Sequence, residues 1–333
     1  MTYKFFVSLA ALTLASSGMV AAQSLSIPAE TAPAKAAWSA PRTPDGQPDL
    51  QGIWNNATGT PMERPAELKG KEFFTEQEAR DWAKTVEARR KVALQRDRDR
   101  GDVGSYEEVF WEIGYKAVRT LRTSIVTDPP DGKIPALTLE AAAEQERRNE
   151  KIRHPERAED LSLKDQCLMF PTGSPPMTPY IYNSNYQIVQ TKDHVAIYVE
   201  MVHDTRIIPL DGRPHLPSNV RLWYGDSIGH WDGDTLVVDT TNFMDKTSFY
   251  GSDRNMHVVE RFRRLDAETI LYQFDVDDST AFTKPWKGEL TMNATSGPIF
   301  EYACHEGNYA LPGVLRGARA DEKAAPAIQS TKQ

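Results

Sequence analysis

From residue 186 onward, hydrophobic and polar positions alternate in short runs separated by Gly, Asp and Asn. A period of two residues is typical of half-buried β-strands, and Asp232-Gly233 and Ser296-Gly297 mark tight turns between runs. The predicted strands cover residues 186–191, 194–202, 205–210, 234–243, 256–264, 268–277, 286–293 and 299–305. Consecutive strands with no helix between them predict an antiparallel meander, either a lipocalin-like barrel of about eight strands or a curled sheet. A β-sandwich is the alternative.

The chain before this region has apolar residues at helical spacing instead. Thr75 and Glu78 fit a capping box at the start of the first helix, and Thr138 is placed to cap the third. The predicted helices cover residues 75–100, 105–118 and 138–153. Two short apolar segments, at 53–54 and 124–126, are strand-like.

These patterns predict an α+β protein with a helical N-terminal arm. The arm (46–165) has limited apolar content, so we expect it to wrap the β domain (166–316) rather than fold alone. The Ala-rich, charged tail (317–333) is expected to be disordered.

The first 22 residues have the pattern of a secretory signal peptide. Lys4 precedes an apolar run of about ten residues, and small residues follow with Val20 and Ala22 at the positions a signal peptidase requires. The run is too short to span a bilayer. The sequence therefore predicts a periplasmic or extracellular protein, cut after about Ala22, with a flexible leader over residues 23–45.

Net charge excludes one class of partner. The formal charge is −8, and removing the signal peptide makes it −9 because one lysine is lost. An acidic chain without a basic, aromatic-interleaved stripe is a poor nucleic-acid binder. No later stretch is apolar enough to predict a membrane span, and no feature specifies an oligomeric state.

Cys167 and Cys304 are the two cysteines, 137 residues apart. In an oxidising compartment such a pair most simply forms one disulfide, with a single reactive thiol as the alternative. Neither cysteine has the spacing of a redox or zinc motif.

Seven segments, in order, resemble a family of secreted bacterial proteins with no generally assigned reaction. They are PRTPDGQPDLQGIW, RTSIVTDPPDGKIPALT, YNSNYQIVQ, EMVHDTRIIPLDGRPH, GDTLVVDTTNF, HVVERF and YACHEGNY. The resemblance covers nearly the whole mature chain and implies secretion and a single architecture, but it supplies no catalytic residues.

Strand alternation selects the first candidates for chemistry. His203 would extend the apolar face of Val195 to Met201 toward one barrel mouth, where it is either a hydrogen-bonded packing residue or a general base. Asp204 and Arg206 would point to the opposite face unless a bulge re-aims them.

Glu260 shares a predicted face with Val258 and Phe262. A carboxylate among apolar neighbours needs either an ion-pair partner, such as Arg206 or Arg221, or a raised pKa and a chemical role. His257 falls on the other face of the same strand.

The stretch YACHEGNY places a thiol, an imidazole and a carboxylate in consecutive positions. On a strand, Cys304 and His305 would face opposite sides, so a nucleophile–base pair between them is geometrically poor. His305 remains a candidate in its own right.

Metal binding is the weaker interpretation, and no cofactor is expected. His203, His257, His305 and Glu306 are ligand types that could hold zinc only if separate strands brought them together. The chain has no metal, hydrolase, P-loop or dinucleotide-binding motif.

Aromatic residues are frequent in the β domain, including Tyr186, Trp286 and Tyr302. They are either ordinary core or the walls of a cavity for an apolar, aromatic or sugar ligand.

Three functions follow as hypotheses. The first is an acid/base enzyme (lyase, isomerase or hydrolase) acting on a small organic substrate in a barrel cavity. His203, His257, Glu260 and His305 would be its catalytic residues, with Arg206 or Tyr302 stabilising an oxyanion. The alternative is a non-catalytic carrier of a small molecule. The third is an envelope interaction protein with the N-terminal arm as its docking surface.

Overall fold

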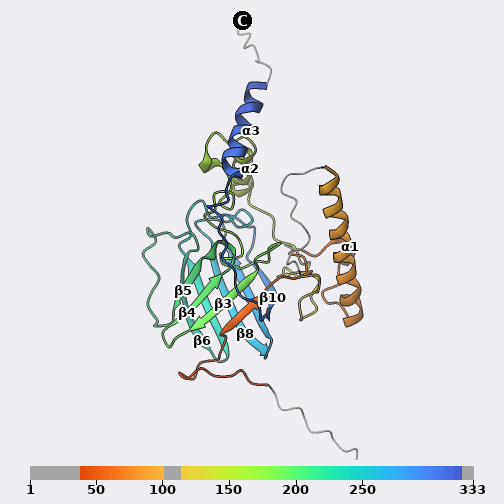
Figure 1. The fold of residues 1–333 in the computed structure, drawn as a ribbon. Helices are drawn as coiled ribbons and strands as arrows, with labels where there is room; N and C mark the ends of the chain where they lie inside the picture. Colours follow the sequence, from red (N-terminus) through yellow and green to blue (C-terminus); the bar gives the residue numbers. More distant parts are fainter. Residues whose placement is uncertain (1–37, 101–113, 325–333) are drawn as a thin grey trace, which may run out of the picture. The chain divides into compact units, whose positions relative to one another are not determined.

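The computed structural model describes residues 38–100 and 114–324. Within these residues ten strands form one antiparallel sheet that curls into a nearly closed barrel (Figure 1). The strands are β1 (Gly52–Asn55), β2 (Val126–Asp128), β3 (Asn185–Gln190), β4 (His194–Val199), β5 (Thr205–Pro209), β6 (Asp226–Asp232), β7 (Thr235–Thr241), β8 (His257–Asp266), β9 (Thr269–Asp277) and β10 (Trp286–Ala294). The predicted α+β class with a mainly antiparallel barrel is confirmed.

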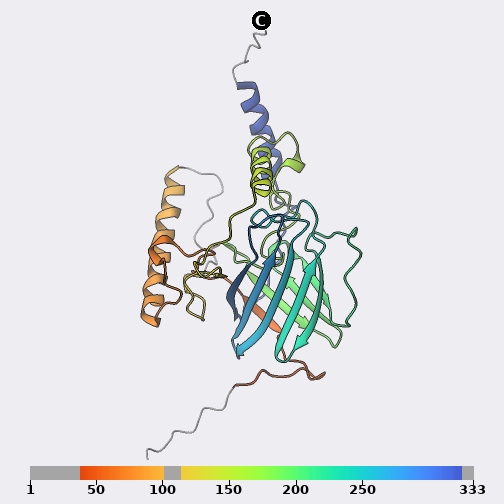
Figure 2. The same cartoon turned by 180° about the vertical axis from the view of Figure 1, so that it is seen from behind.

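The strand order is β5-β4-β3-β1-β10-β9-β8-β7-β6, with β2 pairing to β10. Two meanders, β3 to β5 and β6 to β10, are joined through β1, which pairs with both β3 and β10. Figure 2 shows the strands of residues 226–294, coloured from turquoise to blue, lying side by side.

Alternation along each strand fills the interior of the barrel. Ile197, Val238, Phe262 and Phe274 are fully buried, whereas their sequence neighbours face outward. Because the inward side chains are large, they pack against one another across the barrel and form its core.

The barrel closes where β5 approaches β6, the two ends of the hydrogen-bonded order. Gly229 makes this approach possible, because a Cβ at this position would lie 2.8 Å from Ile208 Cγ2. Arg206 Nη2 on β5 also donates to Ser227 Oγ on β6, at 3.3 Å. Side chains therefore bridge the seam that backbone hydrogen bonds leave open.

Seven of the eight predicted strands match observed strands within a few residues. The sequence missed β6, whose first two inward positions are Ser227 and Gly229, so a large apolar side chain comes only at the third, Trp231. The predicted strand at 299–305 is wrong: this segment has no ladder partner and is held instead by side chains and the disulfide.

Three α-helices lie in the described ranges: α1 (Glu76–Arg100), α2 (Leu139–Arg153) and α3 (Ala310–Ala324). The capping box of α1 is present, because Thr75 N donates to Glu78 Oε2 at 2.8 Å and Glu78 N donates to Thr75 Oγ1 at 3.3 Å. Thr138 caps α2 by accepting from Ala141 N at 3.2 Å. No helix in the described part of the chain is long and apolar enough to cross a membrane.

Several boundary predictions change. The arm contributes β1 and β2 to the sheet, and the tail is helical through Ala324 rather than disordered from Gly317. The end of the leader is tied to the barrel, because Arg42 pairs with Asp234 in the β6–β7 turn. The signal peptide, residues 23–37, most of the predicted helix 105–118 and residues 325–333 lie outside the described residues; Gly114 to Val118 are not helical.

Candidate functional site

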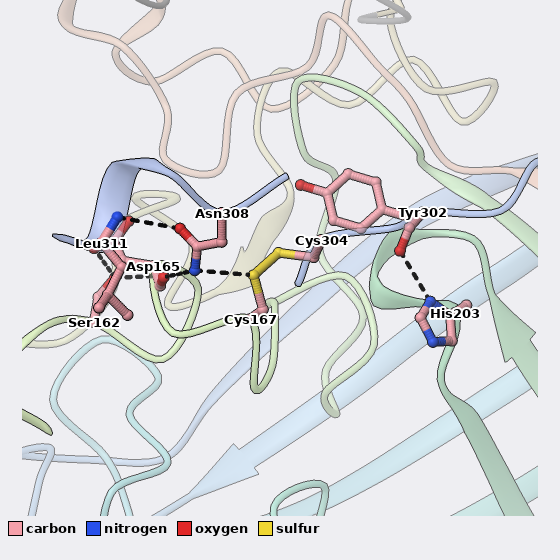
Figure 3. The surroundings of a disulfide bond; sticks show 8 residues. All are labelled: Ser162, Asp165, Cys167, His203, Tyr302, Cys304, Asn308 and Leu311. Carbon is pink, nitrogen blue, oxygen red and sulfur yellow. Dashed lines mark hydrogen bonds between the residues drawn. A yellow bond between two sulfur atoms is a disulfide. The ribbon is translucent and has the colours of Figure 1, made fainter. Parts of the chain in front are cut away.

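The predicted disulfide between Cys167 and Cys304 is present (Figure 3), with the two Cα atoms 5.8 Å apart. Asn308 reinforces this join: its Nδ2 donates to the carbonyl of Asp165 at 2.9 Å, while its Oδ1 accepts from Leu311 N at the start of α3. The bond therefore attaches the C-terminal segment to the 157–174 region. A reactive-thiol role for either cysteine is excluded in this state.

His203 does not continue the face of β4. That strand ends at Val199, and the backbone turns through Val202 and His203, whose φ angles are 66° and 46°. The ring is exposed, and its Nδ1 lies 2.9 Å from the carbonyl oxygen of Tyr302 (Figure 3), so Nδ1 donates. The structure assigns His203 to fastening the C-terminal segment.

The same turn re-aims Arg206. Strand alternation predicted that its side chain points to the face opposite Ile197 and Val199. The two left-handed residues interrupt that alternation, so Arg206 pairs with Ile197 and its side chain lies inside the barrel. There it meets Glu260 in a two-pronged ion pair, with Nη2–Oε2 at 2.6 Å and Nη1–Oε1 at 3.1 Å. Both side chains are almost completely buried, at 3% and 0% exposed.

The carboxylate of Glu260 accepts a further hydrogen bond from Tyr272 OH at 2.7 Å, and that hydroxyl accepts from Met177 N at 2.8 Å. Burial, followed by the neighbouring Glu260 carboxylate, raises the pKa of Tyr272 well above its ordinary value. Glu260 is thus engaged on both oxygens and closed off from solvent. Of the two roles that the sequence allowed for Glu260, the structure therefore shows the ion pair with Arg206 and not a base that a substrate can reach.

The three aromatic candidates are packing residues too. Tyr186 is fully buried and its hydroxyl donates to the carbonyl of Thr172 at 3.0 Å. Trp286 is fully buried against Phe249, with ring centroids 5.9 Å apart and nearly parallel planes. Tyr302 stacks on Tyr182 at 6.4 Å. All three pack the barrel or its end.

His305 is exposed in the turn that follows the disulfide, and its carbonyl accepts from Asn308 N. His257 is on the outer face of β8, while Glu260 points inward. The four proposed catalytic residues therefore occupy different places: the C-terminal turn, the end of β4, the barrel interior and its outer wall. The structure does not bring them together.

His257 belongs to a different group of side chains on the outer wall. Its Nε2 lies 3.0 Å from Asp239 Oδ1 on β7, and the same oxygen lies 3.1 Å from His215 Nε2. His215 Nδ1 in turn lies 2.8 Å from Asp226 Oδ2 at the start of β6. We call these four residues the His–Asp chain. It joins two imidazoles and two carboxylates and holds the 210–225 connection against the barrel.

Sequence reasoning found His257 but missed its partners. The only sequence feature that could have indicated Asp239 and Asp226 is their outward position on their strands. His215 comes from an irregular connection, which has no periodicity to indicate it. No group of three or more His, Cys, Asp or Glu residues in the described ranges is arranged to hold a metal ion. The set proposed for zinc (His203, His257, His305 and Glu306) is dispersed.

The His–Asp chain carries a pH prediction. The hydrogen bond that the His257 ring donates to the Asp239 carboxylate raises the pKa of His257 and lowers the pKa of Asp239. A raised histidine pKa stabilises the fold below its unfolded value and loses this effect as pH rises through the folded value. The Asp239 contribution is lost only in acid, below about pH 4.

We therefore expect His257→Gln to be destabilising at about pH 5.5 and nearly neutral at about pH 8.5. The loss should stay below about 1 kcal/mol because the side chains of His257 and Asp239 are 41% and 38% exposed. Urea unfolding across this range measures it, with His230→Gln, an exposed histidine on β6, as control. A difference that grows with pH would contradict the assignment.

A cavity beside α2 is large enough for a small organic molecule. It has a volume of about 580 Å³ and is lined by one face of α2, by residues between 157 and 174, and by 245–249. None of its lining residues belongs to a strand. Leu161, Met169, Phe170 and Phe249 supply apolar surface, and Gln145, Asn149 and Ser174 supply polar groups.

Comparison with known proteins does not extend this description: no family model, curated protein or solved structure matches the chain. The lipocalin likeness and the resemblance to secreted bacterial proteins remain predictions.

Proposed function

We propose that this is a secreted protein that binds a small organic molecule in the cavity beside α2, and that the barrel is its rigid support. The signal-peptide pattern of residues 1–22 and the disulfide support a periplasmic or extracellular location. The proposal takes the carrier hypothesis of the sequence analysis and moves its site from the barrel interior to the connections at one end.

The cavity is the observation that carries this proposal. Its volume of about 580 Å³ falls within the range of small-molecule sites. Apolar side chains with a few convergent polar groups are the usual composition of such sites, because burial supplies affinity and the polar groups orient the ligand. Phe249 rests on Trp286 of the barrel core, so one wall is firmly supported.

The disulfide supports another part of the lining. Cys167 lies two residues before Met169 and three before Phe170, both of which line the cavity. Irregular segments are ordinarily mobile, so a covalent link at this point holds the lining residues in place. This gives the Cys167–Cys304 bond a direct consequence for binding.

The barrel interior supports catalysis less well. Glu260 is paired with Arg206 and hydrogen-bonded to Tyr272, and these groups are buried among packed side chains. A general base needs a proton donor from the substrate within about 3 Å, and no route to Glu260 is open in this arrangement.

One observation favours a second candidate function, acid/base catalysis at the outer wall. Asp239 orients the His257 imidazole through Nε2, and the ring is 41% exposed. A carboxylate that orients an imidazole is a recurrent arrangement for a general base. Turnover of a small organic substrate, lost in His257→Gln with a changed pH profile, would favour this candidate over simple binding.

The binding proposal is tested by closing the cavity. Asn149 lies on the face of α2 that lines it, so Asn149→Trp should place a ring in the cavity. We expect binding of the amphipathic, anionic fluorophore 1-anilinonaphthalene-8-sulfonate to weaken at least about tenfold, a change of about 1.4 kcal/mol. Fluorescence titration measures this.

Ala143→Trp is the matched control, because Ala143 is an exposed residue of the same helix outside the cavity lining. Equal probe binding in wild type and Asn149→Trp would refute the site. Loss of binding in both variants would point to damage to α2 instead, which circular dichroism detects.

A further inference from the structure

Lys246 lies between two cavities. It lines the cavity beside α2 and also a second, shallower one of about 610 Å³. The second cavity is formed by Ser218, Asn219 and Arg221 of the connection that carries His215, by residues 244–246 and by Arg254. Any ligand in the first cavity whose polar end reaches the 245–246 turn therefore meets the lining of both.

Charge is distributed unevenly around this turn. Seven cationic side chains and four carboxylates line the two cavities, although the whole chain has a net charge of −8. A local excess of positive charge on an acidic protein attracts anions to that place and not to the rest of the surface.

The carboxylates near the turn are already engaged. Glu144 pairs with Arg147 and Arg148. Asp245 pairs with Arg254 at 3.3 Å, and Asp160 Oδ2 accepts from the backbone amides of residues 156 and 157.

Three lysines remain on the cavity lining: Lys151 on α2, Lys164 in the disulfide-bearing segment and Lys246 in the turn. Within the described residues, none of them has a carboxylate at ion-pair distance, and all three are exposed. Glu159 is the only lining carboxylate without such a contact in these residues. The cations that can still take a partner thus outnumber the anions.

Resting on the proposed function, we propose that the ligand is an amphipathic carboxylate. Its hydrocarbon or aromatic body packs on Met169, Phe170 and Phe249, and its carboxylate lies at Lys246. The lysine ammonium is a strongly hydrated point charge that pairs with an anion in any orientation, while the apolar wall selects the body. Lys151 and Lys164 add long-range attraction to the same anion.

The test compares dodecanoate with dodecanol, which share a hydrocarbon chain and differ at the head group. Isothermal titration calorimetry on the full mature chain should show dodecanoate binding at least about tenfold more tightly than dodecanol. The preference should vanish in Lys246→Gln and persist in Lys192→Gln, an exposed lysine in the β3–β4 turn. Salt should weaken binding of dodecanoate alone, because only its charge is screened.

The outcomes separate the two proposals. Equal affinity for both compounds, unchanged in Lys246→Gln but lost in Asn149→Trp, would overturn the carboxylate preference and leave the binding site intact. No binding of either compound, together with no effect of Asn149→Trp on the fluorophore, would overturn both. A preference that survives Lys246→Gln would place the head group elsewhere and overturn the assignment of Lys246.

Discussion

Replacing Arg206 by methionine is expected to lower the free energy of unfolding by about 3–5 kcal/mol, because Glu260 would be left charged in the barrel interior with Tyr272 as its main partner. A domain has only about 5–15 kcal/mol of stability, so this loss is severe. Urea denaturation of the variant measures it, and a fall in melting temperature of roughly 10 °C should accompany it.

The double variant Arg206→Met, Glu260→Leu should recover most of this loss. Desolvating two charges costs about as much as their attraction returns, so an apolar pair of similar volume is often neutral or stabilising. Arg261→Met is the matched surface control, because Arg261 pairs with Asp275 at 3.0 Å with both side chains about one-third exposed. This control should cost at most about 1 kcal/mol. A double variant as unstable as the single one would show that the pair does more than neutralise itself.

Removing the disulfide is the second large effect. Cys167→Ala with Cys304→Ala should lower the free energy of unfolding by about 2–5 kcal/mol, because the bond closes a loop of 137 residues in the unfolded chain. Urea unfolding of the oxidised wild type against the double alanine variant measures the difference. A reductant should bring the wild type to the same value and leave the variant unchanged.

Loss of the disulfide should also have a measurable effect on the C-terminal segment. Without the bond, the 299–309 segment is held by noncovalent contacts such as the His203 contact to Tyr302, the Tyr302–Tyr182 stack and the Asn308 contacts. Limited proteolysis should therefore cut first in this segment, and fluorophore binding should weaken because Met169 and Phe170 lose their anchor. Two free thiols in the oxidised wild type by mass spectrometry would refute the bond.

In the proposed function, the connections between strands bind the ligand and the barrel provides the stability. The cavity is built from α2 and two irregular segments, while the strands supply a packed interior and the ion pair that fixes it. Rigid scaffolds with functional connections are common, because strands cannot change without disturbing the whole ladder. The His–Asp chain fastens one such connection to the barrel wall.

Local patterns were enough to predict most of the elements. Alternation located β3 to β5 and β7 to β10, the capping residues Thr75 and Thr138 located two helices, and cysteine count with compartment predicted the disulfide. These features depend on side-chain period, turn chemistry and chain entropy, which act within or between short segments. β6 was missed because its first two inward residues, Ser227 and Gly229, are not large and apolar.

The candidate site could not be predicted from the sequence, because its residues meet only in the folded structure. The alternation of inward and outward side chains does not continue through a turn with left-handed residues. Val202 and His203 therefore place the side chain of Arg206 inside the barrel, where it meets Glu260. The cavity joins α2, residues 157–174 and the 245–249 turn, and the His–Asp chain joins positions 215, 226, 239 and 257. Such convergence depends on how strands pair and connections pack, because contacts between distant segments leave no period in the chain. Sequence alone therefore specified most of the strands, two helices and the disulfide, and packing decided which side chains could meet a ligand.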